Sequence, residues 1–174
     1  RACLDEGCTE QAEAQRVTSN LVQTVIRNVP GLELGSDQGK PAVPGGYVYF
    51  SHVLTNTGNG PDQYQFCLDN ISNDFAAWTV YRDEDGDGQP DVGGALFNQS
   101  DSDACWDSLT RTLIADETFS LVIEAELSNA VVAGQQPSMR LLASSNEDNA
   151  IVATNTDEAD VVNGPVIEVA KSLS

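Results

Sequence analysis

The chain has 174 residues and a net charge of −19, and only eight of its residues are Lys or Arg. This length suffices for one domain with a hydrophobic core, and so negative a chain is not expected to bind nucleic acid, because nucleic-acid-binding domains are basic. No run of about 18 apolar residues occurs, so we expect no membrane span. No signal-peptide pattern is found at the start, and the chain begins abruptly at Arg1, as a processed product would.

The four cysteines occupy positions 3, 8, 67 and 105, and none belongs to a CxxC pair. His52, the single histidine, is far from them in sequence, so we do not expect a zinc site. Four cysteines allow three pairings, of which we favour Cys3–Cys8 together with Cys67–Cys105. Because disulfides persist in oxidising compartments, this pattern indicates a secreted, extracellular protein.

The N-terminal part mixes two periodicities. Over residues 16–29, valine and leucine recur at helical spacing, whereas the threonines and valines favour a strand, and we predict a strand. After a turn at Pro30-Gly31, we predict a short strand at Leu32–Leu34 and then a loop at Ser36–Gly46, which is rich in glycine and proline.

The remaining sequence alternates strand-like segments with turns rich in glycine, proline, asparagine and aspartate, while residues 93–108 are polar and irregular. The predicted strands are Tyr47–Asn56, Asp62–Asp69, Ala77–Arg82, Leu109–Ile114, Thr118–Leu127, Met139–Ser145 and Ala150–Thr154, the last followed by the acidic stretch Asp157–Asp160.

Regularly spaced strands without a convincing interior helix predict an all-β fold, an immunoglobulin-like antiparallel β-sandwich with extended N- and C-terminal strands. We expect an N-terminal extension with a strand at 1–29, the sandwich at 30–162, and a donor or linker strand at 163–174.

Carboxylates recur at alternate positions in the segment Asp83–Asp91, with glycines at 86 and 88. In a calcium loop the first three aspartates would take positions 1, 3 and 5, and Gly88 the sharp turn at position 6. A backbone carbonyl would act at position 7, and the last aspartate at position 9 through water. The predicted ligands of a structural Ca²⁺ are therefore Asp83, Asp85, Asp87, Gln89 and Asp91.

Position 12 of that loop is Gly94, which replaces the usual bidentate glutamate. Another group must close the site, and Glu84, Asp101 and Asp103 are the nearest candidates. The alternative is an acidic turn that holds no ion.

The two ends of the chain align with each other. Val152–Val169 matches Val17–Leu34 without a gap, one domain length apart, with Pro165 falling on Pro30. If the repeat is genuine, the C-terminal segment is either the first strand of a next domain or a strand offered to a neighbouring subunit. The expected subunit-contact residues are Pro165, Val166, Ile167 and Val169.

Several motifs together resemble a known family of domains. They are Pro44–His52 leading into Thr55–Gly60, Tyr81–Arg82 running into the aspartate loop, Leu113–Thr118 before a long strand, and the terminal Val169–Ser172. Over residues 30–171 the chain resembles the conserved repeat domain, often in tandem, of large bacterial and archaeal cell-surface proteins. The resemblance implies an immunoglobulin-like sandwich in secreted architectural or adhesive proteins, with no catalytic residues. The 93–108 insertion and the cysteine-bearing N-terminus depart from the pattern.

Other candidate chemistry is weaker. His52 has the strand parity of core residues, so we expect it to be buried and hydrogen-bonded rather than catalytic. Asp101-Ser102-Asp103 is interpreted as a solvated or calcium-binding loop, not as a glycosidase pair, and we expect no enzyme. Trp78 alternates like core, while for Trp106, in the insertion, stacking on a sugar stays an open possibility. Asn70 and Asn98 lie in glycosylation sequons.

The first functional hypothesis is a secreted prokaryotic structural subunit that joins copies of itself head to tail into an extracellular filament by strand addition. An alternative is one module of a large calcium-dependent surface adhesin or surface-layer protein, with neighbouring repeats as its partners. A further alternative is a carbohydrate-binding accessory module that uses Trp106 and the calcium loop to bind a cell-surface glycan.

Overall fold

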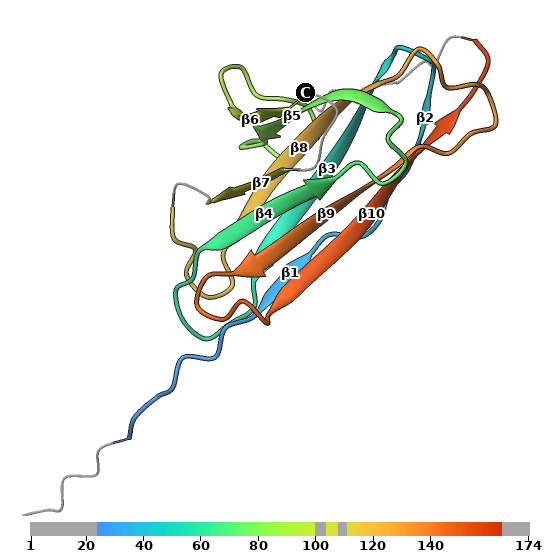
Figure 1. The fold of residues 1–174 in the computed structure, drawn as a ribbon. Helices are drawn as coiled ribbons and strands as arrows, with labels where there is room; N and C mark the ends of the chain where they lie inside the picture. The colour runs from blue at the N-terminus through green and yellow to red at the C-terminus, as the bar shows by residue number, and fades with distance from the viewer. Residues whose placement is uncertain (1–23, 100–103, 108–110, 165–174) are drawn as a thin grey trace, which may run out of the picture.

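The structure, a computed structural model, describes residues 24–99, 104–107 and 111–164. Its described part consists of β-strands joined by turns and loops (Figure 1). The strands are β1 (Leu32–Leu34), β2 (Gly39–Ala42), β3 (Tyr47–Asn56), β4 (Tyr64–Asp69), β5 (Phe75–Arg82), β6 (Ala95–Gln99), β7 (Ala104–Asp107), β8 (Thr118–Leu127), β9 (Ser138–Ser145) and β10 (Val152–Val161).

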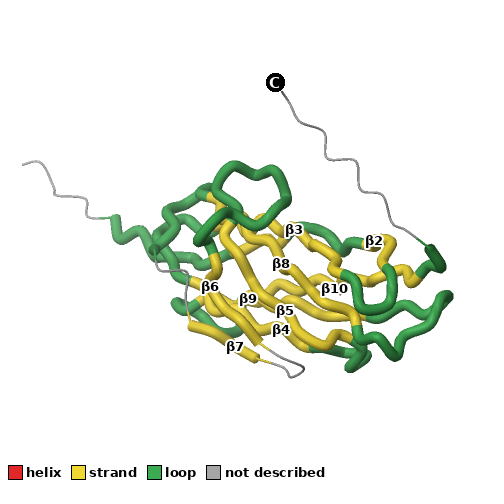
Figure 2. Tube along the Cα trace, turned by 90° about the horizontal axis from the view of Figure 1, so that it is seen from above, coloured by secondary structure: helices red, strands yellow, loops and turns green. Residues whose placement is uncertain are grey.

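The strands form two five-stranded sheets that pack face to face as a sandwich (Figures 1 and 2). Sheet A has the order β1-β3-β8-β5-β6, and sheet B the order β2-β10-β9-β4-β7. All pairings are antiparallel except β2 with β10. Across sheet A, the neighbours β1-β3-β8-β5 correspond to strands A, B, E and D of an immunoglobulin domain. Across sheet B, β10-β9-β4 correspond to strands G, F and C. The predicted immunoglobulin-like sandwich is therefore confirmed.

Alternation of apolar residues explains the central strands. In β8, every second residue from Phe119 to Leu127 is buried, and β3 does the same from Val48 to Leu54. Both strands begin and end where the sequence predicted. β4 likewise buries Tyr64, Phe66 and Leu68 on one face.

Strands at the edges were missed. The predicted loop Ser36–Gly46 contains β2, a four-residue edge strand with Pro41 inside it, and the predicted irregular region 93–108 contains β6 and β7. β10 continues to Val161 through the stretch predicted to be merely acidic. It was missed because Asn155 and Asp157 take buried positions that apolar residues normally hold. Polar residues at buried positions conceal the period of two on which strand prediction depends.

Two predicted strands were wrong in their described parts. Thr24–Val29 belongs to no strand, since it has no partner strand there, and Val25 and Ile26 are more than 80 % exposed. Only residues 111–114 of the predicted strand Leu109–Ile114 are described. There Leu113 forms an isolated bridge to Asp62, and the pairing does not extend into a ladder of several residues. The proposed repeat also fails locally, because Ala159–Val161 is strand whereas the aligned residues 24–26 are not.

The segment between β5 and β8 adds one strand to each sheet: β6 pairs with β5 in sheet A, and β7 with β4 in sheet B. Phe97 of β6 stacks on Trp106 of β7, with ring centroids 5.4 Å apart, and Trp106 also stacks on Phe66 at 5.6 Å. These rings close one side of the sandwich over Trp78, which is buried.

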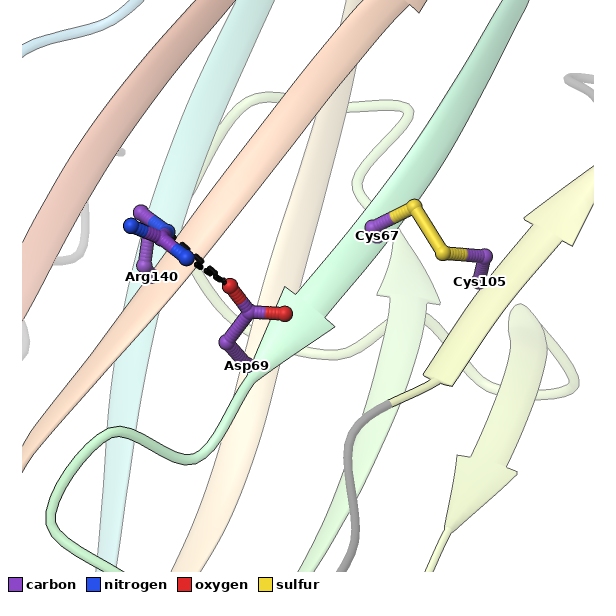
Figure 3. Close-up of a disulfide and its surroundings, with 4 residues drawn as sticks. All are labelled: Cys67, Asp69, Cys105 and Arg140. Carbon is purple, nitrogen blue, oxygen red and sulfur yellow. Dashed lines mark hydrogen bonds and ion pairs between the residues drawn. A yellow bond between two sulfur atoms is a disulfide. The ribbon is translucent and has the colours of Figure 1, made fainter.

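A disulfide joins Cys67 of β4 to Cys105 of β7, in the pairing that the sequence favoured (Figure 3). The two residues lie directly opposite each other in the ladder, with Cα atoms 4.0 Å apart. Nearby, Arg140 of β9 forms an ion pair with Asp69 at the end of β4 (Figure 3). The short strand β7 is thus tied to sheet B covalently.

Candidate functional site

The aspartate loop begins where β5 ends and is folded by its own carboxylates. Asp83, which is 5 % exposed, accepts hydrogen bonds from the backbone N–H groups of Gly86 at 2.8 Å and Gly88 at 3.2 Å. Both glycines have left-handed backbone conformations, with φ of 72° and 76°, which side chains disfavour. Asp85 accepts from the N–H of Asp87 at 3.2 Å, so successive turns wrap the chain around the carboxylates.

The arrangement concentrates negative charge. Carboxylate oxygens of Asp83, Asp85 and Asp87 all lie within 4.8 Å of one another. Burial raises the pKa of Asp83, and the neighbouring aspartates raise it further, against the opposing effect of its backbone hydrogen bonds. A hard divalent cation with oxygen ligands would compensate this charge, so the cluster has the donor set that Ca²⁺ takes. The other two aspartates are exposed, which gives an ion access from solvent.

The rest of the predicted ligand set is only partly gathered. Asp91, predicted to act at position 9 through water, is not one of the three clustered carboxylates. Its Oδ2 accepts the backbone N–H of Glu84 at 2.6 Å and closes the base of the loop, and its part as a ligand stays a prediction. Glu84, a candidate closing ligand, pairs with Arg82 at 2.9 Å. The carbonyl of Gln89 as a ligand stays a prediction, and the other closing candidates, Asp101 and Asp103, lie outside the described residues.

An open cleft of about 540 Å³ lies between the aspartate loop and the start of β6. Its lining combines Arg82, Glu84 and Asp91 with the exposed apolar residues Val92 and Leu96. The cleft is shallow and of mixed polarity, and it leaves the loop accessible to solvent.

The N-terminal segment is anchored by the turn between β3 and β4. The side-chain oxygen of Asn59 accepts the N–H of Val29 at 2.7 Å, and its amide nitrogen donates to the carbonyl of Arg27 at 3.0 Å. Before this anchor the described chain runs away from the sandwich (Figure 1), which leaves Val25 and Ile26 exposed. An apolar extended segment without a partner of its own is thus held at one end of the domain.

His52 lies between the two sheets and is 1 % exposed. Its Nδ1 lies 2.7 Å from the amide nitrogen of Asn155, which also donates to the carbonyl of Gly35 at 2.8 Å. Nδ1 therefore accepts, and Nε2–H donates to Asp157 at 2.8 Å. The prediction of a buried, hydrogen-bonded histidine is confirmed. Sequence reasoning missed its partners, although the polar residues Asn155 and Asp157 alternate in a strand-like stretch.

The tryptophans give no exposed sugar-stacking surface. Trp78 is buried, as predicted, and Trp106, whose role the sequence left undecided, is only 9 % exposed because Phe66 and Phe97 stack on it. The side chain of Asn70 is also buried in the folded domain and donates to the carbonyl of Phe75 at 2.9 Å.

The remaining predicted residues lie outside the described part of the chain. They are Cys3, Cys8, Pro165, Val166, Ile167 and Val169. Within the described ranges, no helix is long and apolar enough to cross a membrane.

No protein-family model matches the sequence, and no curated protein matches it. Solved structures are similar at the level of fold. A CARDB domain of the PF1109 protein from Pyrococcus furiosus, in complex with di-metal ions, is 15 % identical over 83 % of this chain and 95 % of that one, with a TM-score of 0.37. A PapD-like domain of human CEP192 is 15 % identical over 84 % and 96 % of the two chains, with a TM-score of 0.39.

The major pilin subunit BcpA of Bacillus cereus is 11 % identical over 78 % of this chain, with a TM-score of 0.42. The match covers 40 % of the pilin's own length. Matches this distant carry no argument about function.

Proposed function

We propose that the chain is a secreted structural subunit whose copies join head to tail in an extracellular filament, with the C-terminal strand of one copy added to a sheet edge of the next. The observation that carries the proposal is the position of the two described ends. Gly31 enters β1 beside the last residues of β3, whereas Val161 leaves β10 beside Ala42, near the start of β3. A ten-residue strand separates these points by about 30 Å.

Sheet A offers an edge that is suited to an added strand. β1 is three residues long and pairs with β3 from Leu54 to Asn56. Toward the start of β3, where β1 no longer pairs with it, side chains supply the donors that a neighbouring strand would supply. Gln38 donates to the carbonyl of Ser51, and Lys40 to the carbonyl of Tyr49. Backbone N–H groups of an incoming strand would replace these donors, which is how strand addition gains its hydrogen bonds.

Two local features fit extracellular life. The Cys67–Cys105 disulfide is stable in an oxidising compartment. The Asp83, Asp85 and Asp87 cluster would bind Ca²⁺ weakly, and extracellular modules use such sites at millimolar calcium. In this proposal the ion is a structural staple and the chain performs no catalysis.

Truncation tests the proposal. A chain that ends at Gly164 should remain folded and monomeric by sedimentation velocity, while the full chain forms fibres in negative-stain micrographs. Substitution of Ile167 by Asp within the full chain is the matched variant, because it keeps the length and places a charge where an added strand would bury its side chain. Fibres of unchanged abundance from the truncated chain would refute strand donation.

The position of the described ends also suits covalent tandem repeats, so a module of a larger adhesin is the second candidate. The mass of the native secreted species separates the two functions. A mass near one sandwich supports the filament subunit, and a mass of many sandwiches supports the adhesin module.

A further inference from the structure

We propose that the arginine-bearing N-terminal segment of one copy, Thr24–Val29, docks on an acidic, tyrosine-lined face of sheet A in a second copy. The inference rests on the head-to-tail assembly proposed above and adds a second contact to the same junction. We call this surface the Tyr–Glu face, and it comprises Tyr47, Tyr49, Tyr81, Glu124 and Glu126.

Strand register places these side chains on one outer surface. Tyr47 lies opposite Glu126, and Tyr49 opposite Glu124, across the β3–β8 ladder. Tyr81 comes from β5, the neighbour of β8 on the other side. The hydroxyls of Tyr47 and Tyr81 lie 3.4 Å from Glu126 and Glu124 respectively, at the long limit of a hydrogen bond. Tyr47 is 56 % exposed, so the face is open to a partner.

The two carboxylates of the Tyr–Glu face form no ion pair within the described ranges, although Lys40 donates to the carbonyl of Tyr49 at its edge. No Lys, Arg or His within the described ranges lies within 4.0 Å of Glu124 or Glu126. The negative charge of Glu126 raises the pKa of the Tyr47 hydroxyl, so this carboxylate acts directly on the exposed tyrosine. The face is therefore complementary to a positively charged ligand.

The N-terminal segment has the opposite character. Between Glu13 and Glu33 the sequence contains no acidic residue but has Arg16 and Arg27, in a chain of net charge −19 with eight Lys and Arg. Within the described ranges, Arg82, Arg111 and Arg140 form ion pairs and Lys40 donates to a backbone carbonyl, whereas Arg27 has no carboxylate within 4.0 Å.

The same segment exposes apolar surface. Val25 and Ile26 are 82 % and 83 % exposed, and Val29 is 57 % exposed. A guanidinium can pair with carboxylates and also stack on tyrosine rings, while aliphatic side chains pack against those rings. Segment and face thus match in charge and in apolar content.

Geometry assigns the face to a second copy. The segment leaves the sandwich beside Asn56, at the end of β3, whereas Tyr47 and Glu126 lie at the start of β3, about 30 Å away along the strand. The described residues 24–28 extend away from the domain and from that face (Figure 1). A contact between opposite ends is heterologous, so it repeats along a line of subunits without closing as a dimer would.

A charge swap in the full-length chain tests the inference. Arg27→Glu and Glu126→Arg should each raise the critical concentration for assembly, measured by light scattering, by about tenfold, which corresponds to about 1.4 kcal/mol. The two changes in one chain should restore assembly to within about threefold of the wild type. Glu158→Arg, an exposed charge reversal on sheet B, is the control and should not be rescued by Arg27→Glu.

A binding measurement separates this inference from the filament itself. A fluorescent peptide of residues 15–29 should bind the full-length chain by anisotropy, and Glu126→Arg should weaken this binding at least tenfold.

Fibres that form at the same concentration in all variants, with no peptide binding, would overturn the inference and leave the filament proposal standing. Absence of fibres in every variant would refute the filament, and peptide binding abolished by Glu126→Arg would then support the contact alone. Glycan-array binding that Tyr47→Ala abolishes, with no effect of the charge swap, would assign the face to carbohydrate and overturn the proposal.

Discussion

The two sheets meet along two sides of the sandwich, and different interactions hold them together on each side. On the β4–β5 side, an insertion adds a strand to each sheet, stacks Phe97 on Trp106 and fixes β7 through the Cys67–Cys105 disulfide. On the β3–β10 side, the chain crosses from β1 to β2, and a buried hydrogen bond between His52 and Asp157 joins the sheets.

The difference separates a permanent closure from one that can be extended. Aromatic stacking and a covalent bond leave the β4–β5 side little freedom. On the other side, the edge strands β1 and β2 have three and four residues, and side chains satisfy carbonyls of β3 beyond them. Strand addition is therefore expected on the β3–β10 side, and the predictions below test each closure.

The aromatic closure should give the largest effect. Trp106→Ala should lower the free energy of unfolding by about 3–5 kcal/mol, because it removes a large buried ring and leaves a cavity. Denaturant titration measures the loss, with Val92→Ala at a fully exposed position as the control. A loss below about 1 kcal/mol would mean that β6 and β7 do not contribute to the core.

The disulfide should come next. Replacing Cys67 and Cys105 together by serine should cost about 2–4 kcal/mol, since the bond closes a long loop and holds β7 on β4. Hydrogen exchange should increase most in β7 and less in β10. Equal increases across both sheets would contradict a local role for this closure.

The polar closure should be weaker. His52→Ala should cost about 2 kcal/mol, because Asp157 then stays buried without that donor. Replacing both His52 and Asp157 by leucine should lower the free energy of unfolding by less than the sum of the two single losses. The double substitution leaves no buried polar partner unpaired, whereas each single one does. Strict additivity in thermal unfolding would show that the pair is not coupled.

The aspartate loop should contribute about 1 kcal/mol at millimolar calcium. A chelator should therefore lower the melting temperature by a few degrees and speed proteolysis between residues 83 and 108. Asp83→Asn, which weakens the cluster, should abolish the response to chelator. An unchanged melting curve of the wild type in excess chelator would identify an acidic turn without an ion.

The smallest effect concerns pH. A hydrogen bond from the N–H of Ile114, and then the Arg111 guanidinium, lower the pKa of Glu117. A lowered folded-state pKa means stability that is present above the unfolded pKa and is lost as pH falls through the folded one. Glu117→Gln should therefore flatten the acid limb of the melting-temperature profile below about pH 4.5, and an identical limb would exclude this contribution.

The sequence predicted the parts of the fold in which burial and alternation coincide. β3 and β8 were located to the residue because most of their buried positions are apolar, with His52 and Asn56 as the polar exceptions in β3. β10 was cut short because its buried positions carry Asn155 and Asp157, whose partner His52 is distant in sequence. A period of two that includes polar residues becomes visible only once the partner strand is known.

The candidate site shows the same limit. The spacing of Asp83, Asp85 and Asp87 was sufficient to predict their cluster, because a tight loop is a local structure. The hydrogen bond that Asp91 accepts from the N–H of Glu84 was not predicted, since it depends on how the loop closes. β6 and β7 depend on stacking and a disulfide between segments distant in sequence, and Trp106 beside Cys105 in a polar stretch was the available signal.

Electron microscopy of the native material, with and without a chelator, tests the head-to-tail account most directly. The account predicts filaments one sandwich wide with an axial repeat of about 35–45 Å, the length of a ten-residue strand and its turns. Removal of calcium should loosen the aspartate loop without dissolving the filaments, because strand addition does not use the ion. Isolated sandwiches at every protein concentration, with calcium present, would contradict it.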